Sequence, residues 1–387
     1  MNRLHDLYRE HGQSPWLDNL RREWINNGEL ARWVQRGVRG LTSNPSIFQK
    51  AMTSGTQYHG QFAELLAEGM SVADAYWELV LTDIAGALDV LAPVHQKSGG
   101  VDGFVSVEID PNLARDTENT LAAARAINQR VSRPNLYVKI PGTAEGLAAV
   151  EAMTSEGRSV NVTLLFSLSR YAEVIEAYLR GLEAHPGDLS PVSGVASFFI
   201  SRTDTEVDRR LEAIGTPEAL ALRGQTAVAQ GQVAYQIFKQ KFSGPRWEAL
   251  TARGGRVQRP LWASTSTKNP AYPDTLYVEQ LIGPDTVNTL PDATLDAFTD
   301  HGALARTVDA DPDAAQAVLD GVAGVGVDLQ AVADRLEEEG VSAFVKSFED
   351  LLDSLRATAD QLTPGRQADS RSTQNPPARS ERAEGAR

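Results

Sequence analysis

Lys139 is the residue whose position in this sequence points most directly to chemistry. Apolar residues at positions 136, 138 and 140 alternate with Tyr137 and Lys139, and this period of two predicts a short strand. Pro141 ends the strand because proline lacks the N–H that a ladder needs. Burial disfavours an ammonium and lowers its pKa, and the neutral amine can attack a carbonyl to form a Schiff base. The alternative is an edge-strand lysine that extends its ammonium to solvent.

Polar residues occupy the same place on several other predicted strands, at or just beyond the end. They are Asp18, Asn44, Glu108, Asn161, Thr163, Ser197, Arg202 and Ser264. Taken singly, an aspartate at a strand end is usually a helix cap and a lone arginine is usually solvated. Together they indicate one shared site, because the carboxyl ends of barrel strands meet at one mouth.

The elements that must position these residues alternate along the chain. Strands are predicted at 16–20, 38–46, 104–110, 135–141, 159–166, 192–200, 259–264 and 285–290. In the strand at 159–166, residues 161, 163 and 165 are expected on one face. Helical segments separate the strands, and helices continue to about residue 362. This order predicts an α/β fold, a single (β/α)₈ TIM barrel with additional helices over 1–362. Residues 363–387 are rich in Pro, Ser, Gln, Arg and Glu and have almost no apolar side chains, which predicts a disordered tail.

Composition limits the partners. The 387 residues carry a net charge of −14, so nucleic acid and anionic membranes are not expected as partners. With 42% hydrophobic content the chain can bury a large core. The absence of cysteine excludes disulfides and thiolate chemistry. The charged N-terminal residues and the lack of any apolar run of ~18 residues predict neither a secretory signal nor a membrane span. A cytoplasmic protein is therefore expected, either a monomer or a homodimer.

Three segments resemble the signatures of one enzyme family. They are 40–46 (GLTSNPS), 135–143 (NLYVKIPGT) and 161–167 (NVTLLFS), and they resemble the signatures of the transaldolases. The resemblance extends over residues 3–362, with the segments in the same order along the chain. The resemblance implies a Schiff-base (β/α)₈ transferase of the non-oxidative pentose phosphate pathway. Such an enzyme moves a dihydroxyacetone unit from sedoheptulose 7-phosphate to glyceraldehyde 3-phosphate, giving erythrose 4-phosphate and fructose 6-phosphate. It implies sugar-phosphate substrates, no cofactor and no metal.

The resemblance also implies catalytic roles. Lys139 forms the iminium that accepts the electrons of carbon–carbon cleavage. Glu108 delivers a proton through a water that Thr163 holds, which is general acid–base help of roughly 10²–10⁴-fold. Asp18 is the base that deprotonates the C4 hydroxyl.

Substrate-binding roles follow from the same resemblance. Asn44 and Asn161 hydrogen-bond the hydroxyls of the three-carbon unit, and Arg202 binds phosphate with Ser197 close by. Where many members carry an arginine after the seventh strand, this chain has STSTKN at 264–269. Ser264 and Lys268 are therefore candidates for a second phosphate contact; a solvated loop lysine is the alternative.

Two other functions fit part of the pattern. A Schiff-base aldolase that cleaves fructose 6-phosphate without transfer would use the same lysine and fold. Such aldolases are typically shorter and differ at the carboxylate that positions the water, so Glu108 favours transaldolase. A non-catalytic sugar-phosphate-binding barrel would explain Arg202 and Ser197, but it gives no reason for Lys139, Glu108 and Asp18 together.

Overall fold

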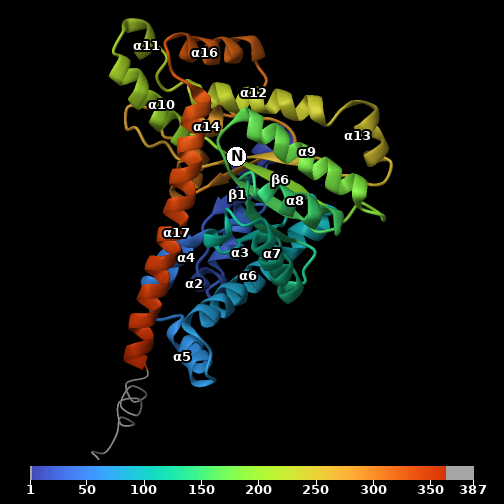
Figure 1. Cartoon of the computed structure of the whole chain (residues 1–387), viewed down its shortest axis with the longest axis vertical. Helices are drawn as coiled ribbons and strands as arrows, with labels where there is room; N and C mark the ends of the chain where they lie inside the picture. The colour runs from blue at the N-terminus through green and yellow to red at the C-terminus, as the bar shows by residue number, and fades with distance from the viewer. Residues whose placement is uncertain (1, 363–387) are drawn as a thin grey trace, which may run out of the picture.

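The computed structural model describes residues 2–362, and the predicted disordered tail at 363–387 lies outside the described residues. The strands are β1 (Gln13–Asp18), β2 (Leu41–Thr42), β3 (Val105–Glu108), β4 (Leu136–Pro141), β5 (Val160–Leu165), β6 (Gly194–Phe199), β7 (Gln258–Ala263) and β8 (Thr286–Leu290). They pair in parallel in sequence order, and β1 pairs with β8, so the sheet closes into a barrel. The predicted (β/α)₈ barrel with additional helices is confirmed (Figure 1).

Helices surround the barrel and fill the connections. Those before β4 are α1 (Arg3–His11), α2 (Arg22–Asn26), α3 (Glu29–Arg36), α4 (Pro45–Thr53), α5 (His59–Ala67), α6 (Val72–Lys97), the 3₁₀ turn η1 (Pro111–Leu113) and α7 (Thr117–Val131). Those between β4 and β7 are α8 (Gly146–Ser155), α9 (Leu168–Ala184), α10 (Ser201–Ile214), α11 (Pro217–Ala221), α12 (Thr226–Lys241) and α13 (Gly244–Thr251). The remainder are α14 (Leu276–Glu279), α15 (Asp292–His301), α16 (Pro312–Gly324) and α17 (Leu329–Leu362).

Several helices begin where the sequence supplies a cap. Ser71 caps α6, since its side chain accepts a hydrogen bond from the Asp74 backbone. Asn44 caps α4 by accepting from the Ile47 backbone at 3.0 Å, with proline at the first helical position. β2 is consequently much shorter than the predicted strand at 38–46, because the chain turns into α4 directly after it.

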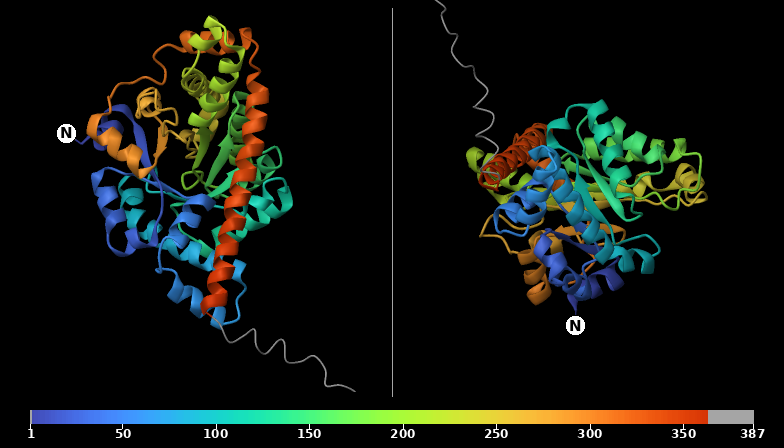
Figure 2. Two further views of the ribbon diagram at one scale, coloured as in Figure 1. Left: turned by 90° about the vertical axis from the view of Figure 1, so that its left-hand side faces the viewer. Right: turned by 90° about the horizontal axis from the view of Figure 1, so that it is seen from below.

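Helix α17 runs along the height of the molecule, from the α10 and α11 corner to α5 (Figure 1; Figure 2). It packs against α4, α6 and α10 and reaches the end of β5. The close approach at β5 depends on Gly340, where a Cβ would lie 3.0 Å from Leu164 and 3.6 Å from the Arg202 guanidinium. One long helix therefore borders the mouth of the barrel.

The apolar core has two main parts. The larger part fills the space between the outer face of the strands and the surrounding helices, and it includes Leu136, Val138 and Ile140 of β4. The second part includes Tyr137 and the side chains that α17 buries near β5, among them Phe344. The alternation predicted for β4 is confirmed, because its apolar residues face outward to the helices and Lys139 faces inward.

The prediction that residue 165 shares a face with Asn161 and Thr163 is wrong. The register between β5 and β6 shifts between Val162 and Leu165, and Leu164 has a φ of +61°. This bulge turns Leu165 outward into the larger core, while Leu164 packs toward α17. A left-handed φ is costly for a leucine, so packing against α17 must stabilise it.

The opposite end of the barrel is closed by a buried charge cluster. Asp102 accepts hydrogen bonds from Arg39 at 2.7 Å, from Ser14 at 2.9 Å and from Arg259 at 3.0 Å. The two guanidinium groups hold the pKa of Asp102 below its usual range despite burial, which acts in the opposite direction. Polar residues at this end of a (β/α)₈ barrel usually stabilise the fold and take no part in catalysis.

Within residues 2–362, none of the helices combines the length and the apolar character that crossing a membrane would take.

Candidate active site

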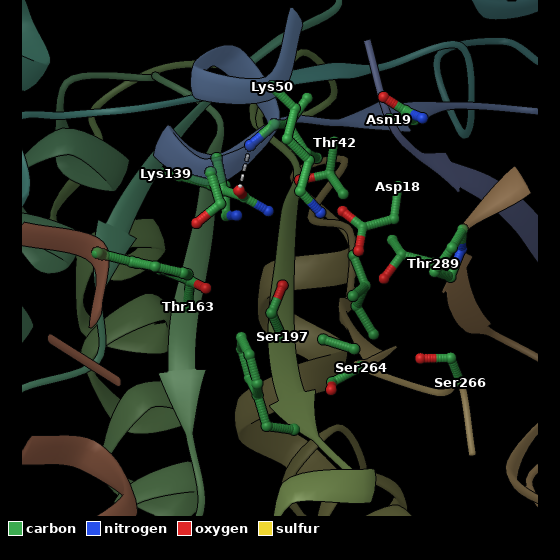
Figure 3. A pocket seen from close by; sticks show the side chains of 18 of the residues that line it. Asp18, Asn19, Thr42, Lys50, Lys139, Thr163, Ser197, Ser264, Ser266 and Thr289 are labelled. Carbon is green, nitrogen blue, oxygen red and sulfur yellow. Dashed lines mark hydrogen bonds between the residues drawn. The ribbon is translucent and has the colours of Figure 1, made fainter. Parts of the chain in front are cut away.

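A cavity of about 400 Å³ opens at the carboxyl ends of the strands. Among the residues predicted from the sequence, those that line it are Asp18, Asn44, Lys139, Thr163, Ser197, Arg202, Ser264 and Lys268. They come from different strands and the connections that follow them, and their side chains surround one space (Figure 3). Glu108 and Asn161 lie beneath this lining, in contact with residues that form it.

Lys139 is held in a buried position at the inner end of the cavity. Its side chain is 6% exposed, and its Nζ donates a hydrogen bond of 3.1 Å to the Ser43 carbonyl. Strand pairing places Lys139 between Glu108 on β3 and Asn161 on β5. The ammonium lies 3.4 Å from Glu108 Oε2, so a carboxylate is within reach of the group that would attack a carbonyl.

Glu108 is a carboxylate whose protonation the fold perturbs. Burial raises its pKa, and the charge of Lys139 acts in the opposite direction. Its Oε2 has no hydrogen-bond partner among residues 2–362, because the approach of Lys139 lacks hydrogen-bond geometry. A hollow of about 10 Å³ borders Glu108, Asn44 and Tyr76, which is roughly the space of one water molecule. A buried carboxylate with a raised pKa suits proton delivery.

A chain of hydrogen bonds lies below the cavity. Ser197 Oγ donates to Asn161 Oδ1 at 2.7 Å, and Asn161 Nδ2 donates to Ser106 Oγ at 3.0 Å. Asn161 is fully buried, whereas Ser197 also borders the cavity. The hydroxyl of Thr163 borders the cavity as well and has no hydrogen-bond partner in the described part of the chain. Thr163 can therefore accept or donate to a molecule in the cavity without breaking a bond.

Asp18 faces Lys139 across the cavity (Figure 3). Burial raises the pKa of its carboxyl, and the nearby cations Lys139, Lys268 and Arg202 oppose this rise. Asp18 is the last residue of β1 and pairs with Thr42 of β2, so the strand itself directs it. A carboxylate in this place can remove a proton from a hydroxyl of a bound molecule.

Asn44 and Ser264 both border the cavity at points where the backbone turns. The Asn44 Oδ1 is used to cap α4, which leaves its amide N–H groups for the cavity. Ser264 has a φ of +56° directly after β7, and its Oγ shares a hydrogen bond of 2.9 Å with Ser201.

Arg202 and Lys268 bring positive charge to the side of the cavity near α10. The Arg202 guanidinium lies 5.1 Å from the centre of the Phe199 ring and 6.0 Å from that of Phe344. Burial lowers the pKa of Arg202. Burial also lowers the pKa of Lys268, and the positive charge of Arg202 acts in the same direction. The Lys268 Nζ donates to Ser266 Oγ at 2.6 Å. Two cations so arranged favour an anion such as a phosphate.

Comparison with known proteins agrees with this geometry. The family model described as Transaldolase/Fructose-6-phosphate aldolase matches residues 15–355. The chain belongs to this family. It is 53% identical to a Transaldolase of Thermobifida fusca over 347 residues, covering 88% of this chain and 94% of the relative. It is 50% identical to a Transaldolase of Parafrankia sp. over 350 residues, with 89% and 95% covered. For a Transaldolase of Mycobacterium marinum the identity is 49% over 357 residues, with 91% and 96% covered.

This member of the transaldolase/fructose-6-phosphate aldolase family has cavity residues that sequence reasoning missed. The most informative are Lys50 of α4, Arg21 before α2 and Phe344 of α17. Lys50 could have been found, since it follows the Asn44 cap by six residues on a short helix at the mouth. Phe344 gave no local signal, because it is one apolar residue of a long helix whose path only the tertiary structure fixes.

Proposed function

We propose that this chain is a transaldolase that transfers a dihydroxyacetone unit from sedoheptulose 7-phosphate to glyceraldehyde 3-phosphate. The observation that carries the proposal is the buried Lys139 ammonium, 3.4 Å from Glu108 and facing Asp18 across one cavity. Relatives about half identical over most of the chain bear the name Transaldolase, which supports the same function.

The reaction starts with attack of the Lys139 amine on the C2 carbonyl of the donor. The resulting carbinolamine must lose its hydroxyl as water, so a proton has to reach that oxygen. Glu108 supplies the proton through a water held at the Thr163 hydroxyl, and this loss leaves the iminium. Within residues 2–362 neither Glu108 Oε2 nor the Thr163 hydroxyl has a hydrogen-bond partner, which supports this route.

Cleavage then requires a base at the C4 hydroxyl. Asp18 takes that proton, the C3–C4 bond breaks, and its electron pair moves into the iminium to give an enamine. The aldehyde product, erythrose 4-phosphate, leaves with its phosphate. The enamine stays attached to Lys139 and attacks the aldehyde carbon of glyceraldehyde 3-phosphate, while Asp18 returns the proton to the new hydroxyl. Hydrolysis of the iminium releases fructose 6-phosphate.

Binding residues hold the two ends of the substrate. Asn44 contacts the hydroxyls of the three-carbon unit, and Asn161 reaches them through Ser197, which lies between Asn161 and the cavity. Arg202 and Lys268 bind the phosphate. Support for this division is that Asn161 pairs with Lys139 between β4 and β5, and that Asn44 follows Ser43, whose carbonyl accepts from Lys139. Arg202 and Lys268 come instead from α10 and from the connection after β7.

Ser264 belongs to the same phosphate side of the cavity. Its Oγ lies 2.9 Å from that of Ser201 at the start of α10, so a phosphate bound by Arg202 would be close to it. The iminium provides the electron sink, and the proposal therefore names no metal and no cofactor. A single catalytic domain over 1–362, a cytoplasmic location and a monomer or homodimer stay predictions.

An assay with and without acceptor tests the proposal. Fructose 6-phosphate and erythrose 4-phosphate should give sedoheptulose 7-phosphate and glyceraldehyde 3-phosphate at a rate that depends on erythrose 4-phosphate. Release of free dihydroxyacetone at an equal rate without acceptor would instead identify a fructose 6-phosphate aldolase. No product in either assay would leave only a binding function.

A further inference from the structure

Lys50 is a further cation in the active-site cavity, beside Arg202 and Lys268, and the roles proposed above do not use it. It lies on α4, and its side chain points into the cavity toward Asp18 (Figure 3). Within residues 2–362 its ammonium forms no ion pair and no hydrogen bond. Arg202 lies on α10 and Lys268 in the connection after β7, so three separate elements each direct a cation to one space.

The position of Lys50 is fixed by the helix that carries it. Asn44 caps α4, and Ser46 shares a hydrogen bond of 2.7 Å with Ser347 of α17. Lys50 follows Ser46 by four positions, so the two lie on the same face of α4, and both border the cavity. Helix α4 is thus held against α17 while its Lys50 face is turned to the substrate space.

Electrostatics indicate which group Lys50 serves. Lys50 is one of four cations whose charge opposes the rise of the Asp18 pKa, after Lys139, Lys268 and Arg202, so Asp18 does not depend on Lys50 alone. The positive charge of Lys50 also acts on Lys268, adding to burial and Arg202 in lowering the pKa of that ammonium. Cations that disfavour one another in this way would all be stabilised by a phosphate between them.

Substrates of a transaldolase place their phosphate at more than one distance from Lys139. A seven-carbon and a six-carbon ketose are both attached to the lysine through C2, so their phosphates differ by one carbon–carbon bond, roughly 1.5 Å. A guanidinium fork fixes the position of the phosphate it binds, whereas a lysine is a point charge on a flexible stem. Lys50 is exposed whereas Arg202 is half-buried. The flexible stem of Lys50 would let its ammonium follow a phosphate that a longer sugar carries further from Lys139.

We propose that Lys50 binds the substrate phosphate together with Arg202 and Lys268, and that it contributes more to seven-carbon than to six-carbon donors. This inference rests on the proposed transaldolase function. It makes Lys50 a specificity-determining residue whose contact is adjustable, while Arg202 supplies the rigid contact common to both sugars.

The test compares Lys50→Met with wild type on three donors, sedoheptulose 7-phosphate, fructose 6-phosphate and unphosphorylated fructose. We expect KM to rise about tenfold for sedoheptulose 7-phosphate, the size of one charge-assisted hydrogen bond. The rise for fructose 6-phosphate should be about threefold or less, and kcat/KM for fructose should not change. Lys50→Arg should recover most of the loss. Lys97→Met, at the end of α6 remote from the cavity, is the matched control and should behave as wild type.

Three results would overturn the inference. An equal loss with fructose would mean that Lys50 acts on the carbon chemistry. An equal rise in KM with both phosphorylated sugars would mean that Lys50 does not distinguish seven-carbon from six-carbon donors. Unchanged KM and kcat/KM for all three donors would mean that Lys50 does not bind the phosphate. Failure of the proposed function is distinct, because wild type itself would then not transfer the three-carbon unit.

Discussion

Replacing Arg202 with alanine is expected to weaken the use of phosphorylated sugars and to leave the carbon chemistry intact. Its guanidinium contacts two phenylalanine rings, and in residues 2–362 it makes no hydrogen bond and no ion pair. Burial already lowers its pKa, so the cation is partly desolvated without a hydrogen-bond or ion-pair partner in the described part of the chain. A bound phosphate would provide that partner.

The magnitude follows from the hydrogen bonds that a guanidinium fork can make. A charge-assisted hydrogen bond contributes about 1.5–3 kcal/mol, and a fork donates two of them. The lower end is about 3 kcal/mol, and each 1.4 kcal/mol is a factor of ten. Arg202→Ala should therefore lower kcat/KM for fructose 6-phosphate by about a hundredfold or more. KM should carry much of this loss, and kcat should fall as well if the phosphate positions C2 over Lys139.

The decisive assay repeats the measurement with unphosphorylated fructose as donor. Wild type should lose heavily on that change of donor, whereas Arg202→Ala should lose little, because its phosphate contact is already gone. Arg209→Ala is the matched control on the same helix, since Arg209 pairs with Glu206 on the outer side. If Arg202→Ala loses as much as wild type when the phosphate is removed, Arg202 is not the anchor, and Lys268 becomes the candidate.

The remaining predictions concern three carboxylates. Glu108→Gln should slow Schiff-base formation, seen as slower borohydride-trappable adduct, because the proton for the departing hydroxyl is lost. Asp18→Asn should form that adduct at the normal rate but cleave the carbon–carbon bond slowly. Because burial raises the Asp18 pKa, kcat/KM of wild type should fall on the acidic side at a pH above the usual carboxyl range, and Asp18→Asn should not show this fall. Accumulation of the same species in the Glu108 and Asp18 variants would contradict the separate roles. Burial raises the pKa of Asp204 from 3.8 to about 6, so the folded state binds the proton more tightly and stability falls as pH rises through this window. Two pKa units correspond to roughly 3 kcal/mol. The free energy of unfolding measured in urea should therefore fall by about that much more for wild type than for Asp204→Asn between pH 4 and pH 7. A difference that is constant with pH would refute it.

The barrel could be predicted because its strands carry period-two patterns that local sequence displays. Lys139, Glu108 and Asp18 could be singled out for the same reason, since a polar side chain on the inner face of an apolar strand breaks the pattern at a definite point. The parallel order of the strands then required their carboxyl ends to meet. The strands and the polar residues at their carboxyl ends could therefore be predicted from the sequence.

Features that depend on packing against α17 could not be predicted from the sequence. The bulge in β5 turns Leu165 outward, and it depends on packing of Leu164 near Gly340, more than 170 positions further along the chain. Phe344 beside Arg202 has the same origin. Neither leaves a local pattern, because a helix of 34 residues presents many apolar positions and only tertiary contacts decide which of them borders the site.

Borohydride reduction in the presence of fructose 6-phosphate tests the central claim most directly. The claim is that Lys139 is the nucleophile, and reduction should fix the dihydroxyacetone unit or the whole sugar on the peptide that contains Lys139. Lys139→Ala and Lys139→Arg should fold normally, with neither adduct nor turnover. Lys50 and Lys268 also border the cavity and serve as internal controls that should remain unmodified. An adduct on either of these lysines, or one that persists in Lys139→Ala, would contradict the account.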